Sequence, residues 1–211
     1  MGTVYRKGNV MNRKLLPMLA CGLLVTTALC GCSQIEQDKA VTEIKKLGGI
    51  VGYDETNPDR PLIRVTLKGG QVTDASLEHL KALTQLQSLD LEDSNVTNVG
   101  LVHLKSLTQL QTLSLVSTKV GDAGLEHLKA LPQLQDLNLR NTEITDDGLT
   151  HLKGLMQLQY LSLANTAVTD GGLGHLKGLM QLRVLTLWNT SVTGAGISDL
   201  QKALPGCKMR Y

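Results

Sequence analysis

One pattern recurs six times along the chain at an interval of 24 residues. It reads LQDLNLRNTEITDDGLTHLKGLMQ from Leu134 to Gln157, and the other copies begin at Leu62, Leu86, Leu110, Leu158 and Leu182. A fixed period of about 20 to 29 residues with leucines at positions 1, 4 and 6 is typical of a solenoid in which each repeat adds one strand and one short helix. Stacked repeats share one continuous core, so we expect a single α/β array.

The positions within each repeat predict its local structure. Leucines at positions 4 and 6 alternate with polar residues and indicate a short strand with its apolar side inward. Thr-Asp at positions 12 and 13 begins a helix, and we expect the aspartate to cap its free N–H groups. These aspartates are Asp74, Asp122, Asp146 and Asp170. Glycine at position 15, replaced by Ser76 in the first repeat, indicates close contact between neighbouring repeats, since it otherwise costs a helix about 1 kcal/mol.

The spacing of the elements predicts the shape of the array. Adjacent strands lie about 4.8 Å apart and packed helices about 8 to 10 Å apart, so stacked repeats must bend with the strands inside. Crossovers between parallel strands are right-handed. We therefore expect a leucine-rich repeat solenoid, a right-handed curved arc with parallel strands on the concave face and short helices on the convex face.

The predicted boundaries follow the changes in pattern. We assign residues 1–31 to a signal peptide, 32–61 to lipid attachment and an N-terminal cap, 62–205 to the six repeats and 206–211 to a C-terminal cap strand. Within the N-terminal cap we expect a helix over Gln34–Leu47 and a strand over Ile50–Tyr53, and the first repeat then begins with a strand over Leu62–Leu67.

The leader has the features of a bacterial secretory signal. Residues 11–32 run from a basic start through an apolar stretch to small residues. Leu29-Cys30-Gly31-Cys32 resembles the lipobox, which implies cleavage before Cys32, lipid attachment at Cys32 and, with Ser33 following, anchoring at the periplasmic face of the outer membrane. Met11 then looks like a better start than Met1. The alternative is an uncleaved signal anchor, although the apolar run is short for a membrane-spanning helix.

Charge and cysteine content exclude several classes of site. The formal net charge is +2, but removing residues 1–31 leaves 17 basic against 19 acidic side chains, or −2. Such a mildly acidic chain lacks the electrostatic footprint of nucleic-acid binding. Beyond Cys32 the only cysteine is Cys207, so we expect no disulfide, no cysteine metal site and no cofactor.

The repeats resemble bacterial leucine-rich repeat proteins of the V-T-D-x-G-L-x-H-L type, which are close to the repeats that accompany F-box domains in eukaryotic ubiquitin-ligase adaptors. The resemblance covers about residues 41–211, including the ending A-L-P-x-C-K at Ala203–Lys208. No F-box precedes the repeats, so the adaptor function is not implied. Position 9, usually Asn or Cys in the wider family, is Ser94, Thr118, Thr142, Thr166 or Thr190 here. A hydroxyl can satisfy fewer loop carbonyls than an amide.

A histidine column at position 18 could suggest metal binding. Its members are His79, His103, His127, His151 and His175. Metal ligands must lie within about 2.1 Å of one ion, whereas helices about 8 to 10 Å apart bring together at most two histidines. A residue repeated in every copy also marks what each repeat needs to fold. We therefore favour a structural role and expect no metal site.

Recognition should use the positions at which the repeats differ. The outward strand positions 3, 5 and 7 vary, and the only aromatics within the repeats, Tyr160 and Trp188, lie there. Aromatics and arginines are common interface anchors. The candidate concave patch comprises Asp136, Asn138, Arg140, Tyr160, Arg183, Val184 and Trp188. The alternative is that these are scattered surface residues. A separate acidic group could hold a cation or form a solvated face; it consists of Asp90, Glu92 and Asp93.

These features predict a non-enzymatic, membrane-anchored scaffold that binds a protein or peptide through its concave face. The alternative is a structural component of an envelope assembly without a discrete ligand. No nucleophile elbow, phosphate loop or metal motif occurs in the sequence, which disfavours an enzyme.

Overall fold

The computed structural model describes residues 34–211, so the predicted signal peptide, the alternative start at Met11 and the lipid attachment at Cys32 lie outside the described residues. Gln37–Tyr211 forms one compact unit, which we call the second unit because it follows the N-terminal residues, and the fold below is that of this unit. Within the described part, no helix combines the length and apolarity needed to cross a membrane.

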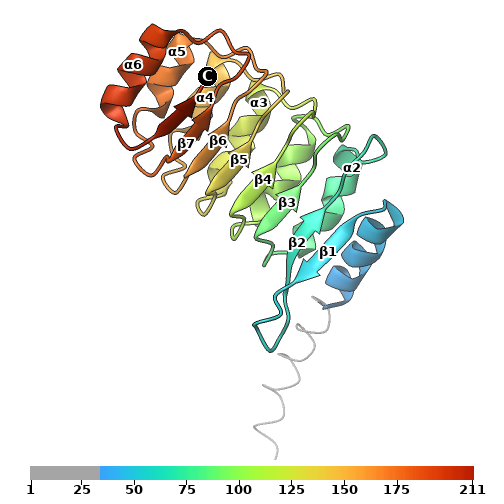
Figure 1. Cartoon of the computed structure of the whole chain (residues 1–211). Helices are drawn as coiled ribbons and strands as arrows, with labels where there is room; N and C mark the ends of the chain where they lie inside the picture. Colours follow the sequence, from blue (N-terminus) through green and yellow to red (C-terminus); the bar gives the residue numbers. More distant parts are fainter. Residues whose placement is uncertain (1–33) are drawn as a thin grey trace, which may run out of the picture. The chain divides into compact units, whose positions relative to one another are not determined.

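An eight-stranded sheet runs through the second unit, with its strands in chain order (Figure 1). The first strand, β1 (Ile50–Tyr53), pairs antiparallel with β2 (Leu62–Thr66). Parallel strands follow, namely β3 (Ser88–Asp90), β4 (Thr112–Ser114), β5 (Asp136–Asn138), β6 (Tyr160–Ser162), β7 (Val184–Thr186) and β8 (Lys208–Arg210). The predicted strands at Ile50 and Leu62 are therefore confirmed.

Short helices lie on one side of this sheet (Figure 1). Most begin with a single α-helical turn that tightens into 3₁₀ geometry. The elements are α2 (Asp74–Leu77) and η1 (Glu78–Ala82), η2 (Gly100–Ser106), α3 (Asp122–Leu125) and η3 (Glu126–Ala130), α4 (Asp146–Leu149) and η4 (Thr150–Leu152), α5 (Asp170–Leu173) and η5 (Gly174–Leu176), and α6 (Gly194–Ala203). Residues 34–46 are also helical, and Ala40 and Ile44 join the core.

The register of the parallel strands equals the sequence period. Leu137 pairs with Leu113 on one side and Leu161 on the other, each 24 residues away. Equivalent leucines therefore stack directly, and Leu137 and Leu161 have no exposed surface. One continuous core results, and the expected α/β leucine-rich repeat solenoid is confirmed.

The helix starts differ from expectation. The side chain of Thr145 accepts a hydrogen bond from the N–H of Asp147 and caps α4, and Thr169 caps α5 in the same way. Asp146, the first residue of α4, turns its carboxylate to the following repeat and accepts from the Thr169 N–H and hydroxyl. The prediction that Asp74, Asp122, Asp146 and Asp170 cap their own helices is therefore wrong, because each binds the position-12 threonine of the next repeat instead.

The glycines at position 15 lie where successive repeats touch, as predicted. A Cβ atom at Gly148 would overlap the Asp122 carboxylate of the preceding repeat. Ser76 occupies this position in the first repeat, where no repeat aspartate precedes it. Its hydroxyl instead accepts a hydrogen bond from the Thr73 N–H at 3.1 Å.

The position-9 hydroxyls are buried or, at Thr190, half-buried, and each donates a hydrogen bond within its own repeat. Thr142 donates to the carbonyl of Leu139 at 2.6 Å, and Ser94, Thr118, Thr166 and Thr190 make the equivalent bond. The preceding residue, Asn141, has a φ of 54°, in the left-handed region that asparagine tolerates better than most residues. Asn141 therefore serves the turn of the scaffold.

Candidate binding face

The outward side chains of β2 to β8 form what we call the strand face. Position 3 contributes Arg64, Ser88, Thr112, Asp136, Tyr160, Val184 and Lys208. Position 5 contributes Thr66, Asp90, Ser114, Asn138, Ser162, Thr186 and Arg210. Position 7, just beyond each strand, contributes Lys68, Glu92, Val116, Arg140, Ala164 and Trp188. The backbone under these side chains is fixed by the sheet and the leucine core.

The structure brings most of the predicted patch together. Tyr160 lies between Asp136 and Val184 in the position-3 column. Trp188 is 56% exposed, and the buried Ala164 separates its place in the position-7 column from that of Arg140. The exposed indole is therefore available to a partner side chain, whereas Ala164 is covered.

Two members of the predicted patch contribute less to the exposed surface of the three columns. Asn138 is half-buried, and its Oδ1 accepts a hydrogen bond from the Arg140 N–H at 3.2 Å, so it orients the loop after β5. Arg183 is exposed but precedes β7, at the edge of the strand face and outside its three columns. Its carbonyl accepts from the Lys208 N–H at 2.7 Å.

Strand β8 adds two basic residues that sequence reasoning missed. Lys208 pairs with Val184 and Arg210 with Thr186, so both continue the outward columns. The signal was present, because each lies 24 residues after its partner, as a seventh partial repeat would place it. The prediction of a cap strand over residues 206–211 does not include this role, because the repeat leucines that mark the register are absent there.

Thr186 occupies the centre of this end of the strand face. Its side chain is only 5% exposed, and its hydroxyl oxygen makes no hydrogen bond within the described residues. It lies in the position-5 column between Ser162 and Arg210. A buried hydroxyl without a partner is unfavourable, and because this oxygen has almost no accessible surface, Thr186 belongs to the floor of the strand face.

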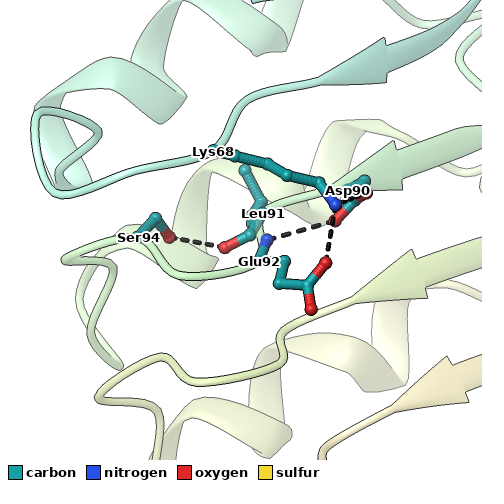
Figure 2. Close-up of polar contacts among 5 residues, drawn as sticks. All are labelled: Lys68, Asp90, Leu91, Glu92 and Ser94. Carbon is teal, nitrogen blue, oxygen red and sulfur yellow. Dashed lines mark hydrogen bonds and ion pairs between the residues drawn. The ribbon is translucent and has the colours of Figure 1, made fainter.

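Two members of the acidic group near the start of the face share an ion pair with one lysine. Figure 2 shows Lys68 of the first repeat extending to Asp90 and Glu92, with Nζ 2.9 Å from the Asp90 carboxylate and 2.6 Å from that of Glu92. Hydrogen bonding to Glu92, and then to Asp90, raises the pKa of Lys68. Asp93 has a φ of 56° and forms the left-handed turn. The protein's own Lys68 therefore occupies the place between Asp90 and Glu92 that a bound cation would take.

The histidine column places one histidine in each of η1 to η5. No three His, Cys, Asp or Glu side chains in residues 34–211 are grouped to hold a metal ion. Burial, followed by the charge of Lys105, lowers the pKa of His127. The Nδ1 atoms of His103 and His127 are buried without a hydrogen-bond partner in the described part.

Cys207 is buried, and desolvation raises the pKa of its thiol.

The repeated strand–helix unit and the mostly parallel sheet define a leucine-rich repeat fold, and residues 130–152 match the family described as Leucine Rich repeat. No curated protein matches the chain.

Two solved internalins of Listeria monocytogenes are similar in structure. One, inlF, superposes with a TM-score of 0.55 at 24% identity, covering 63% of this chain and 36% of the internalin. This chain thus spans about a third of that protein, and the likeness shows the fold alone. The other, internalin C2 (inlC2), has a TM-score of 0.54 at 25% identity and covers 70% of each chain.

Proposed function

We propose that this chain is a non-enzymatic protein-interaction module of the cell envelope, anchored by lipid at Cys32, that binds a protein or peptide partner through its strand face. The observation that carries this proposal is the exposed Trp188 on a face whose backbone is held by a continuous leucine core. A rigid surface loses little conformational entropy on binding, which favours recognition of an extended segment.

The strand face suits recognition because its variable side chains project from a sheet that the repeated core leucines hold in place. Tyr160 and Trp188 supply aromatic area with few rotatable bonds, and Arg140 supplies several hydrogen-bond donors. Ser162 and Ala164 are small and buried, Tyr160 is half-buried and Trp188 is exposed, so Trp188 is the more accessible of the two rings.

A cross-linking pull-down from envelope extract tests the choice of face. The variant Tyr160→Ala/Trp188→Ala should lose partners that the wild type captures. The matched control is Val99→Ala/Val102→Ala, which removes exposed apolar side chains from the helix side, where Val99 is 69% exposed. Loss of capture in the control and not in the strand-face variant would contradict the proposal and favour the alternative, a structural element that packs into an envelope assembly by its helix side.

Anchoring is tested separately. Cys32→Ser should move the protein from the membrane fraction to the soluble fraction, because the acylated residue is removed, and metabolic labelling with a palmitate analogue should disappear with it. Unchanged membrane association without labelling would point to an uncleaved signal anchor.

A further inference from the structure

The two ends of the strand face differ in charge compensation. From β2 to β4 its columns carry two basic and two acidic residues, and Lys68 is paired with both acids; the four are Arg64, Lys68, Asp90 and Glu92. From β5 to β8 the columns carry one acidic residue, Asp136, against the basic Arg140, Lys208 and Arg210. Arg183 lies at the edge of this end.

The basic residues of the β5–β8 end are exposed, and none of them forms an ion pair in the part of the chain that the structure describes. Trp188 follows β7, which lies between the strand that precedes Arg140 and the strand that carries Lys208 and Arg210. Uncompensated cations and an exposed indole therefore lie on one end of the same face. Both kinds of group gain from a partner that supplies carboxylates and an apolar side chain.

We propose that the β5–β8 end of the strand face binds an acidic, extended peptide segment, a conclusion that rests on the proposed function and specifies its partner. Carboxylates of the segment pair with Arg140, Lys208 and Arg210. An apolar side chain of the segment packs on Trp188. Four strands span about 14 Å, which corresponds to about four residues of extended chain.

A peptide fits this surface better than a continuous polyanion or an anionic membrane. Asp136 lies directly beside Tyr160 in the position-3 column, within the same end of the face. Its carboxylate repels a uniformly charged phosphate backbone or lipid headgroup layer, whereas a peptide can place a neutral or basic residue there. The order of charges across the strands thus favours a segment with separated acidic residues.

Binding of randomised peptides tests the charge preference. Pools of short peptides enriched in Asp and Glu, in Asn and Gln, or in Lys and Arg are passed over the immobilised, delipidated protein at low salt. Wild type should retain the acidic pool roughly tenfold better than the neutral pool. The double variant Lys208→Glu/Arg210→Glu should abolish this preference, and Arg140→Glu, on a different strand, should weaken it. Thermal unfolding of each variant checks its fold.

Arg64→Glu is the matched control, because it reverses an exposed charge in the same position-3 column at the other end of the face. Its retention of the acidic pool should equal that of wild type. Equal retention of all three pools, an unchanged preference in the double variant, or an equal loss in Arg64→Glu would overturn the proposal. Vesicles of phosphatidylglycerol provide the membrane arm, and their binding without peptide selectivity would also overturn it.

The pull-down described above separates this inference from the proposed function. If Tyr160→Ala/Trp188→Ala loses partner capture while Lys208→Glu/Arg210→Glu keeps it, the strand face binds a partner but acidic recognition is wrong. If neither variant loses capture, both proposals fail.

Discussion

Asp146 and Thr169 join two successive repeats. The Asp146 carboxylate accepts hydrogen bonds from the Thr169 N–H at 2.8 Å and from its hydroxyl at 2.6 Å. The Thr169 oxygen then accepts from the Gly171 N–H and caps the helix that follows. One carboxylate therefore fixes the position at which the next helix begins. The same link recurs as Asp74 to Thr97, Asp122 to Thr145 and Asp170 to Thr193.

Removing one of these links should destabilise the array. Asp146→Ala loses two hydrogen bonds to a charged acceptor, so we expect the free energy of unfolding to fall by about 1–3 kcal/mol in urea denaturation. Asp147→Ala is the matched control, since this exposed neighbour lies in the same helical turn and its side chain makes no hydrogen bond in the described residues. Equal losses in the two variants would show that stability depends on negative charge at the helix start and not on the hydrogen bonds between Asp146 and Thr169.

The junction between the second and third repeats departs from this pattern at both the aspartate and the threonine position. Asn98 replaces the aspartate and accepts from the Gly121 N–H at 2.7 Å, and Gly121 replaces the threonine that would supply a hydroxyl. Gly121 has an ordinary extended backbone, and an added Cβ would lie 3.4 Å from the Glu143 carbonyl oxygen. Threonine should therefore fit at this position.

The double variant Asn98→Asp/Gly121→Thr should rebuild the standard link. We expect a gain of about 1 kcal/mol in the free energy of unfolding, larger than the sum of the two single changes, because only the pair has both the charged acceptor and the hydroxyl donor. A double-mutant cycle measures the coupling. A strictly additive result would argue against cooperation between the two positions.

Glycine at position 15 should resist substitution even though alanine is the better helix former. In Gly172→Ala the new Cβ would lie 2.9 Å from Asp146 Cγ and 3.0 Å from Leu149 Cδ1, closer than carbon atoms normally approach. We expect a loss of about 1–3 kcal/mol. Gly174→Ala is the control, because no atom lies within 4 Å of its added Cβ and its backbone is helical. It should be neutral or stabilising by up to about 1 kcal/mol, and similar losses for both would rule out the steric explanation.

Much of the fold could be predicted because the same residues recur at the same spacing. The leucines and the period predict strands, helices and register, since similar repeats stack with their equivalent residues in equivalent positions. The direction of the Asp146 carboxylate could not be predicted. A Thr-Asp pair at a helix start reads as a local cap, and the competing partner lies 23 residues further along the chain.

The binding face was only partly predictable for a related reason. Alternation along the strands predicts which side chains point outward, but the pairing of Asp90 and Glu92 with one lysine depends on how far Lys68 reaches toward the next strand. The contribution of Lys208 and Arg210 depends on β8 keeping the register after the leucine pattern ends. Both are contacts between repeats, which the pattern of a single repeat does not contain.

His127 should make stability depend on pH near neutrality. Its pKa lies below the ordinary value of 6.5, first because of burial and then because of Lys105, so the unfolded chain binds the proton more readily than the folded protein. The contribution of His127 to the free energy of unfolding is therefore fully present above its pKa in the unfolded chain. It is lost as the pH falls through its lower pKa in the folded protein. We expect His127→Gln to reduce the fall in the free energy of unfolding between about pH 7 and about pH 5. His79→Gln, at the exposed equivalent in the first repeat, serves as the control. Parallel pH profiles for His127→Gln and wild type would assign the effect to other groups.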